Sequence, residues 1–144
     1  MRLFKKKLNK PVVYTMKSCS YCKMLTTELE KQNIKFIEKD IEKYRDEWNK
    51  TTRITSMSQT PTVFFNNTYL TPMRDFKNPN QLIEILNGLK NISNKSDIET
   101  IELLKTLNFR TSDAFNKLAS TLKKLEENTA SCNPMNAKVI ENVD

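Results

Sequence analysis

The apolar positions of the first ninety residues alternate between short extended runs and helical spacings. Residues 12–15 form an apolar run that predicts a buried strand, and residues 20–32 repeat apolar side chains every three to four positions, which predicts a helix. A second short run at 34–37 predicts another strand. A strand, a helix and a strand over this length indicate a parallel crossover pair.

The pattern continues with two more strands between two helices. The predicted elements are a helix capped by Asp40 and ending near Ile54, strands at 61–65 and 68–70, and a helix from Pro79 to Gly88. Asn66 and Asn67 separate the two strands and favour a tight hairpin turn, because Asn tolerates the backbone conformation that such a turn requires. The order βαβαββα predicts an α/β fold with a four-stranded mixed sheet flanked by helices on both faces.

Beyond a polar stretch at 91–96, two further helices are predicted at 97–108 and 112–127. Their apolar stripes are Ile98, Ile101, Leu104 and Leu107 in the first, and Phe115, Leu118, Ala119, Leu122 and Leu125 in the second. A helix that is apolar on one stripe needs a partner, which could be the preceding domain, the other helix or a second subunit. We therefore divide the chain into a basic arm (1–10), an α/β domain (11–90), a two-helix extension (91–128) and a tail expected to be mobile (129–144).

The composition excludes several classes of chemistry. The 144 residues include three Cys, one Gly and no His. Without His there is no Ser–His triad, no zinc site with imidazole ligands and no histidine general base. The single Gly, Gly88, excludes glycine-rich phosphate loops. A sparse and odd number of Cys is typical of a reducing compartment and not of a secreted disulfide framework, so we expect a cytoplasmic protein.

The formal net charge is +7, and the basic residues are densest in the N-terminal arm, at Arg2, Lys5, Lys6, Lys7 and Lys10. We interpret this group as a solvated arm, with attraction to nucleic acid, acidic partners or an anionic membrane surface as the alternative. Nucleic acid is disfavoured, because the basic residues lack interleaved aromatics and a recognisable module. No apolar stretch indicates a signal peptide or a membrane span, so no membrane partner is expected.

The main candidate for chemistry is the dithiol Cys19-Ser20-Tyr21-Cys22, which lies between the first predicted strand and its helix. The free N–H groups of a first helical turn favour an anion, and a Cys placed there can have its pKa lowered from about 8.5 to about 3.5–7.5. Spacing i, i+3 brings the two sulfurs within bonding reach. We predict that Cys19 is the nucleophile and Cys22 the resolving thiol. An inactive remnant and a zinc site are the alternatives, although zinc needs four ligands and the chain has three thiols.

Residues 12–22 read Val-Val-Tyr-Thr-Met-Lys-Ser-Cys-Ser-Tyr-Cys, and Thr60 and Pro61 precede the third predicted strand. The first segment is similar to the strand and C-P-Y-C motif of glutaredoxins, with Ser20 in place of Pro. The second resembles the Thr-Pro loop of the thioredoxin superfamily, whose proline is cis. Residues 11–90 therefore resemble a glutaredoxin-like protein of that superfamily. The resemblance implies a thioredoxin fold in which both motifs meet at one site.

The same resemblance implies that glutathione is a co-substrate, held by Lys17, Tyr21, Thr60, Pro61 and Asp75. Glutaredoxins carry Gly-Gly-x-Asp-Asp after the fourth strand, whereas residues 71–75 here read Thr-Pro-Met-Arg-Asp. Asp75 matches the second acid, and Arg74 reverses the charge of the first. The alternatives are that Lys17 is a surface lysine, that Tyr21 packs beneath the loop, and that Asp75 caps the last helix of the domain.

These features predict a glutaredoxin-like thiol–disulfide oxidoreductase that reduces protein disulfides or glutathione mixed disulfides. Its electron donor would be glutathione or a thioredoxin reductase. One alternative is a [2Fe–2S] cluster held between two subunits by Cys19 and glutathione, which Ser20 permits by freeing the loop. The other is an interaction protein that acts through its C-terminal helices, with a homodimer as one form. Cys132 is interpreted as a bystander, with a regulatory or intermolecular disulfide as the alternative.

Overall fold

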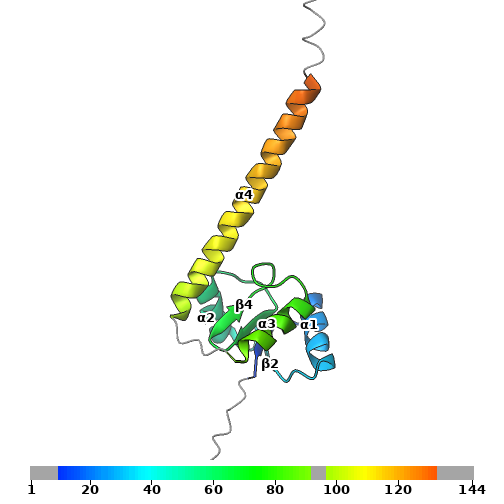
Figure 1. Cartoon of the computed structure of the whole chain (residues 1–144). Helices are drawn as coiled ribbons and strands as arrows, with labels where there is room; N and C mark the ends of the chain where they lie inside the picture. Colours follow the sequence, from blue (N-terminus) through cyan, green and yellow to red (C-terminus); the bar gives the residue numbers. More distant parts are fainter. Residues whose placement is uncertain (1–9, 92–96, 133–144) are drawn as a thin grey trace, which may run out of the picture. The chain divides into compact units, whose positions relative to one another are not determined.

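The computed structural model describes residues 10–91 and 97–132 (Figure 1). The described elements are β1 (Val12–Thr15), α1 (Ser20–Lys31), β2 (Ile37–Asp40), α2 (Arg45–Thr55), β3 (Thr62–Phe65), β4 (Thr68–Leu70), α3 (Pro79–Leu89) and α4 (Ile98–Cys132). This confirms the predicted order βαβαββα up to α3. The predictions for residues 1–9, for most of the 91–96 stretch and for residues 133–144 of the tail lie outside the described residues.

The four strands form one mixed sheet in the order β2-β1-β3-β4. β1 pairs with β2 in parallel and with β3 antiparallel, and β3 pairs antiparallel with β4. The turn between β3 and β4 is made by Asn66 and Asn67, whose φ angles are 49° and 59°. Positive φ at both central residues is what a two-residue hairpin turn of the right twist requires, and Asn accepts it more readily than most residues. The predicted four-stranded sheet and its Asn-Asn turn are both confirmed.

Alternation along the strands sends neighbouring side chains to opposite faces of the sheet. On one face, α1 and α3 lie side by side (Figure 1) and cover Val13, Val63, Phe65 and Leu70, with Leu25, Leu29, Phe76, Leu82 and Leu86 completing the core. On the other face, Tyr14 and Tyr69 pack with Ile54 of α2, and Trp48 and Ile98 pack against this cluster. Helices therefore cover both faces of the sheet, as the sequence predicts.

β2 begins three residues later than predicted, because α1 ends in a cap that uses the predicted start of the strand. Asn33 has a φ of 54° and donates its N–H to the Glu30 carbonyl, and Ile34 donates to the Leu29 carbonyl. This is the Schellman arrangement, which satisfies the last carbonyls of a helix. Ile34 then packs on the core, and the strand starts at Ile37, whose N–H donates to the Pro11 carbonyl.

α2 also begins later than predicted, at Arg45 and not at Asp40. Asp40 is the last residue of β2, and its side chain accepts a hydrogen bond from the Glu42 N–H at 2.8 Å. Its carbonyl accepts from the Tyr44 N–H at 2.9 Å. Asp40 therefore caps a turn that precedes the helix.

The predicted two-helix extension is wrong, because a single helix, α4, spans Ile98–Cys132. No Gly or Pro lies between these two residues, so nothing in the backbone chemistry stops the helix where the break was predicted. The predicted apolar stripe at its start is wrong in part, because only Ile98 and Ile101 of its four members are partly buried. Leu104 and Leu107 are exposed, whereas Glu102 and Thr106 are buried.

The chain divides into two compact units after Thr106. The first unit contains the sheet and the first turns of α4, so it extends past the boundary predicted at residue 90. The described part of the second unit, residues 107–132, is the remainder of α4. No helix within residues 10–91 and 97–132 has the length and apolar character needed to span a membrane.

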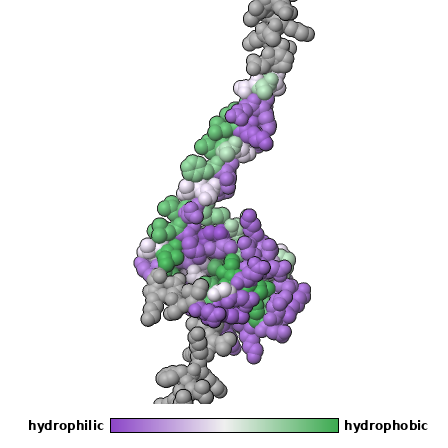
Figure 2. All heavy atoms as spheres, viewed as in Figure 1, coloured by the Kyte–Doolittle hydropathy of each residue, from purple (hydrophilic) through white to green (hydrophobic). Residues whose placement is uncertain are grey.

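Hydrophobic side chains line one side of α4, and hydrophilic ones line the other (Figure 2). Phe115, Leu118, Leu122 and Leu125 are 52–67% exposed. Cys132, predicted in the tail, is the last residue of the helix and carries an exposed free thiol.

Candidate active site

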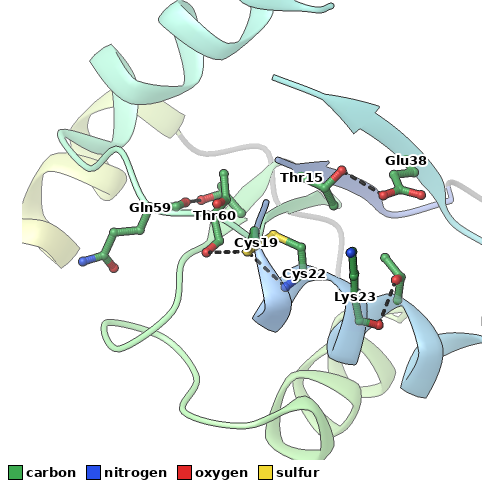
Figure 3. The surroundings of a disulfide bond; sticks show 9 residues. Thr15, Cys19, Cys22, Lys23, Glu38, Gln59 and Thr60 are labelled. Carbon is green, nitrogen blue, oxygen red and sulfur yellow. Dashed lines mark hydrogen bonds between the residues drawn. A yellow bond between two sulfur atoms is a disulfide. The ribbon is translucent and has the colours of Figure 1, made fainter. Parts of the chain in front are cut away.

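The dithiol lies where β1 ends and α1 begins (Figure 3). Cys19 is the N-cap of α1, with extended backbone (φ −83°, ψ 105°), and its N–H donates to the Met16 carbonyl at 3.0 Å. Its sulfur accepts the N–H of Cys22 at 3.1 Å. Because the free N–H groups of a first helical turn carry partial positive charge, this position favours an anionic sulfur once the pair is reduced.

Cys19 and Cys22 are joined in a disulfide, with their Cα atoms 5.3 Å apart. The structure therefore represents the oxidised form of the pair. Cys22 is only 2% exposed, whereas Cys19 is partly exposed. Cys19 is therefore the more accessible of the two sulfurs to an incoming substrate.

The second predicted motif lies against the first. The Thr60–Pro61 peptide bond is cis, as the resemblance implied, and Pro61 is buried directly before β3. The Thr60 carbonyl oxygen lies 3.8 Å from the Cys19 sulfur (Figure 3). The Thr62 hydroxyl donates to the Gln59 carbonyl at 2.6 Å, which holds the loop that leads into β3. The fold therefore brings together two motifs that are 41 residues apart.

Tyr21 and Lys17, two further predicted site residues, have different surroundings. The ring of Tyr21 packs against Phe76, with the ring centroids 6.4 Å apart, and its buried hydroxyl has no hydrogen-bond partner among the described residues. Burial raises the pKa of Tyr21 above its usual 10.0. This placement favours packing beneath the loop over contact with a substrate. Lys17 is exposed at the surface next to the dithiol.

A cavity of about 380 Å³ reaches Cys22 between β1, α1 and the turn after β2. Its lining includes the cations Lys17, Lys23 and Lys43 and the carboxylates Glu38 and Asp40. The Thr15 hydroxyl donates to Glu38 at 2.8 Å and holds that carboxylate over the end of β1 (Figure 3). Sequence reasoning did not identify this cavity, because its residues come from three elements that only the parallel strand pair brings together.

Asp75, the predicted glutathione ligand, points into the protein and does not cap α3. The N-cap of α3 is Asn78, whose side chain accepts the Gln81 N–H at 2.9 Å. One oxygen of Asp75 accepts the Thr71 N–H at 2.7 Å and the Nε–H of Arg74 at 2.8 Å. Capping of the last helix, the alternative for Asp75, is therefore wrong.

Arg74 is the unexpected residue of this segment, because its side chain is only 2% exposed. Its guanidinium pairs with Glu102 of α4 at 2.6 Å and also donates to the Tyr69 carbonyl at 3.0 Å. Glu102 is fully buried and accepts the Tyr69 N–H at 3.0 Å. Lys105 approaches Glu102 at 3.1 Å and Asp75 at 3.3 Å. Residues 71–75, which correspond to the Gly-Gly-x-Asp-Asp motif of glutaredoxins, are thus tied to the start of α4.

The sequence contains one signal that could have revealed this cluster. Glu102 follows Ile98 by four residues and precedes Thr106 by four, so the three share one helical face. Ile98 packs against the sheet, and a carboxylate on the same face therefore needs a buried cation. The predicted stripe was drawn from the Ile and Leu positions alone, so it did not include Glu102 and Thr106.

Residues 12–70 match the sequence model of the glutaredoxin family. The matched range includes both cysteines and the Thr60–Pro61 bond, and it ends directly before the 71–75 segment. Neither the curated proteins nor the solved structures contain a significant match to the chain. Together with the four-stranded mixed sheet, its flanking helices and the Cys19–Cys22 pair, this match fits a glutaredoxin-like protein of the thioredoxin superfamily.

Among residues 10–91 and 97–132, no group of three or more Cys, Asp or Glu side chains is placed to hold a metal ion.

Proposed function

We propose that this glutaredoxin-like domain is a thiol–disulfide oxidoreductase that reduces protein disulfides or mixed disulfides through Cys19 and Cys22. The observation that carries the proposal is the asymmetry of the pair. Cys19 is accessible and receives the Cys22 N–H at 3.1 Å, whereas Cys22 is 2% exposed. This asymmetry supports Cys19 as the sulfur that attacks the substrate and Cys22 as the sulfur that reacts second.

The reaction begins from the reduced pair. The Cys19 thiolate attacks one sulfur of the substrate disulfide, that S–S bond breaks, and the departing sulfur leaves as a thiolate that takes a proton from water. Cys22 then loses its proton and attacks the Cys19 sulfur, which releases the second substrate thiol and forms the Cys19–Cys22 disulfide. Two electrons have passed to the substrate. A thiol donor, such as glutathione or a thioredoxin reductase, returns them to the pair.

The backbone around Thr60 supports the substrate contact in this scheme. Its carbonyl lies 3.8 Å from the attacking sulfur, in the loop that precedes β3. An extended polypeptide laid along this loop can form hydrogen bonds with its main chain. Lys17, exposed beside the dithiol, adds positive charge that favours a thiolate.

The test compares the two single-cysteine variants with wild type. Cys19→Ser should abolish reduction of both insulin and a glutathionylated peptide, since the nucleophile is lost. Cys22→Ser should lose insulin reduction but retain some reduction of the glutathionylated peptide, which needs one thiol. Cys132→Ser is the matched control, because it removes the exposed thiol at the end of α4. Full disulfide reduction by Cys19→Ser would refute the assignment.

The same purified protein distinguishes the cluster-binding alternative. A [2Fe–2S] cluster shared between two subunits would require glutathione as a ligand, and the acid expected to hold glutathione, Asp75, is already paired with Arg74 and Lys105. The residues present therefore do not fit that cofactor. A brown colour and visible absorbance after anaerobic purification, lost in Cys19→Ser, would favour the cluster instead.

We also propose that the exposed stripe of α4 is an interface for a second copy of this chain. Phe115, Leu118, Leu122 and Leu125 follow one another at steps of three, four and three residues, which is the spacing of a two-stranded coiled-coil seam. Each remains more than half exposed in the single chain. Leu118→Ser with Leu122→Ser should convert a dimer to a monomer in analytical ultracentrifugation. A wild-type chain that sediments as a monomer at high concentration would contradict this interface.

A further inference from the structure

Four charged side chains form a neutral cluster behind the 71–75 segment. Arg74 lies 2.6 Å from Glu102 and 2.7 Å from Asp75, and Lys105 lies 3.1 Å and 3.3 Å from the same two carboxylates. The side chains of Arg74 and Glu102 are 2% and 0% exposed. Two cations thus face two anions, and none of these charges is left to attract a ligand.

Asp75 is the residue of this cluster that the family resemblance assigns to glutathione. Its Oδ2 accepts from the Thr71 N–H at 2.7 Å and pairs with Arg74, while its Oδ1 pairs with Lys105. Both oxygens are therefore engaged inside the protein. An ammonium group approaching Asp75 would be attracted by the carboxylate and repelled by two nearby cations, so the Coulomb energies largely cancel.

Glu102 keeps this arrangement in place. Four donors converge on its carboxylate, from Arg74, Lys105, the Thr68 hydroxyl and the Tyr69 N–H. It holds the guanidinium inward, under the segment and away from solvent. The first turns of α4 therefore determine the charge that the 71–75 segment offers to a substrate.

We propose that Glu102, Arg74 and Lys105 are specificity-determining residues, which by neutralising Asp75 make the site select disulfides presented by a polypeptide main chain over glutathione. This inference rests on the proposed oxidoreductase function. The three residues act through Asp75 and do not touch the reacting sulfurs. The main-chain contact at Thr60, 3.8 Å from Cys19, remains available and has no requirement for an ammonium group.

The decisive experiment measures recognition of the ammonium group alone. S-methylglutathione and its N-acetylated form, which lacks that charge, are titrated into the full chain while the amide NMR signals of the 71–75 segment are followed. Wild type should bind both compounds equally weakly. Lys105→Gln should prefer the free-amine compound by at least about threefold, as expected for one partly exposed charge. Lys105 is chosen because it is the more exposed cation, and its loss leaves the buried Arg74–Glu102 pair intact.

Lys117→Gln is the matched control, because Lys117 lies on the same helix and also pairs with a carboxylate, Asp113, at 2.7 Å. It should leave the preference unchanged. A wild-type preference of tenfold or more for the free amine would overturn the proposal. An unchanged preference in Lys105→Gln would overturn it as well, including the case in which neither compound produces a shift.

A second measurement follows turnover of one peptide carrying either glutathione or 2-mercaptoethanol as a mixed disulfide. Wild type should reduce both at similar rates, and Lys105→Gln should favour the glutathionylated form. A strong wild-type preference for the glutathionylated peptide would refute the inference. Absence of turnover with either peptide and with insulin would refute the oxidoreductase function itself, and the binding comparison would still decide whether the cluster excludes an amine.

Discussion

Removing the Glu102 carboxylate should destabilise the first unit more than the loss of any exposed ion pair. Glu102→Ala leaves the Arg74 guanidinium, 2% exposed, without one of its two carboxylates. It also leaves the Tyr69 N–H and the Thr68 hydroxyl without the acceptor that they share in the folded protein. Thr68, Tyr69 and Glu102 are all buried, so water cannot easily replace the lost partner.

The size of the effect follows from the geometry. Breaking a buried ion pair by removing one partner costs about 3–5 kcal/mol, because the remaining charge stays buried. Arg74 keeps Asp75 at 2.7 Å, which places the expected loss at the lower end, about 3 kcal/mol. For a domain of this size each kcal/mol lowers Tm by about 4–8 °C, so the loss should amount to about 12–24 °C.

Urea unfolding followed by the fluorescence of Trp48 measures the loss in the free energy of unfolding. Trp48 is the single Trp, and its ring centroid lies 5.9 Å from that of Tyr14 on the sheet. Glu28→Ala is the control, because Glu28 pairs with Lys31, whose side chain is 65% exposed, and such pairs contribute at most about 1 kcal/mol. The double variant Arg74→Met with Glu102→Gln should recover most of the loss, since no buried charge is then left unpaired. If Glu102→Ala costs no more than Glu28→Ala, the buried pair does not exist in solution.

Three further predictions concern the fold around the site. Leu25→Ala should lower the free energy of unfolding by about 2–5 kcal/mol in urea titrations, because Leu25 is fully buried, whereas Met24→Ala, at a side chain 52% exposed, should change it little. Asn78→Ala should lower the same quantity by about 1 kcal/mol, since α3 loses the side chain that accepts the Gln81 N–H, and Asn80→Ala should not. Tyr14, Tyr21 and Tyr69 should ionise above pH 10.0 in an ultraviolet titration of the folded chain, because burial raises their pKa, and at about pH 10 in urea. Their contribution to stability is complete below pH 10.0 and is lost as the pH rises through the folded pKa values.

Each of these predictions has a clear contrary result. Equal losses for Leu25→Ala and Met24→Ala would contradict the assigned core, and equal losses for the two Asn variants would contradict the cap of α3. Tyrosines that titrate together at the same pH in folded and unfolded protein would show that these rings are solvated.

Local sequence signals predicted most of the scaffold of the site. The apolar run before Cys19 and the helical spacing after it act over a few residues, so they place the dithiol at a helix N-terminus without reference to the rest of the chain. The Asn66-Asn67 turn is equally local, because the conformations it needs depend on those two residues. The prediction failed at residue 34, where a strand signal and a helix-capping signal overlap. Ile34 belongs to the C-terminal cap of α1 and not to the strand that was expected there.

The pairing of Thr60 with Cys19 was predicted through a family resemblance and not from the residues alone, since 41 positions separate them. The family match itself ends at Leu70, so it offered no information on the segment that follows. From the sequence, Arg74 was a charge reversal in a binding motif. In the structure, it is a buried cation whose partner lies 28 residues further along the chain.

The sequence by itself determined the order of strands and helices up to α3, the position of Cys19 at a helix N-terminus and the lack of histidine side chains in these 144 residues, because these depend on neighbouring residues and on composition. Only the tertiary structure decided which face of α4 is buried and what neutralises Asp75. A buried charge needs a partner, and no local pattern records which distant residue supplies it.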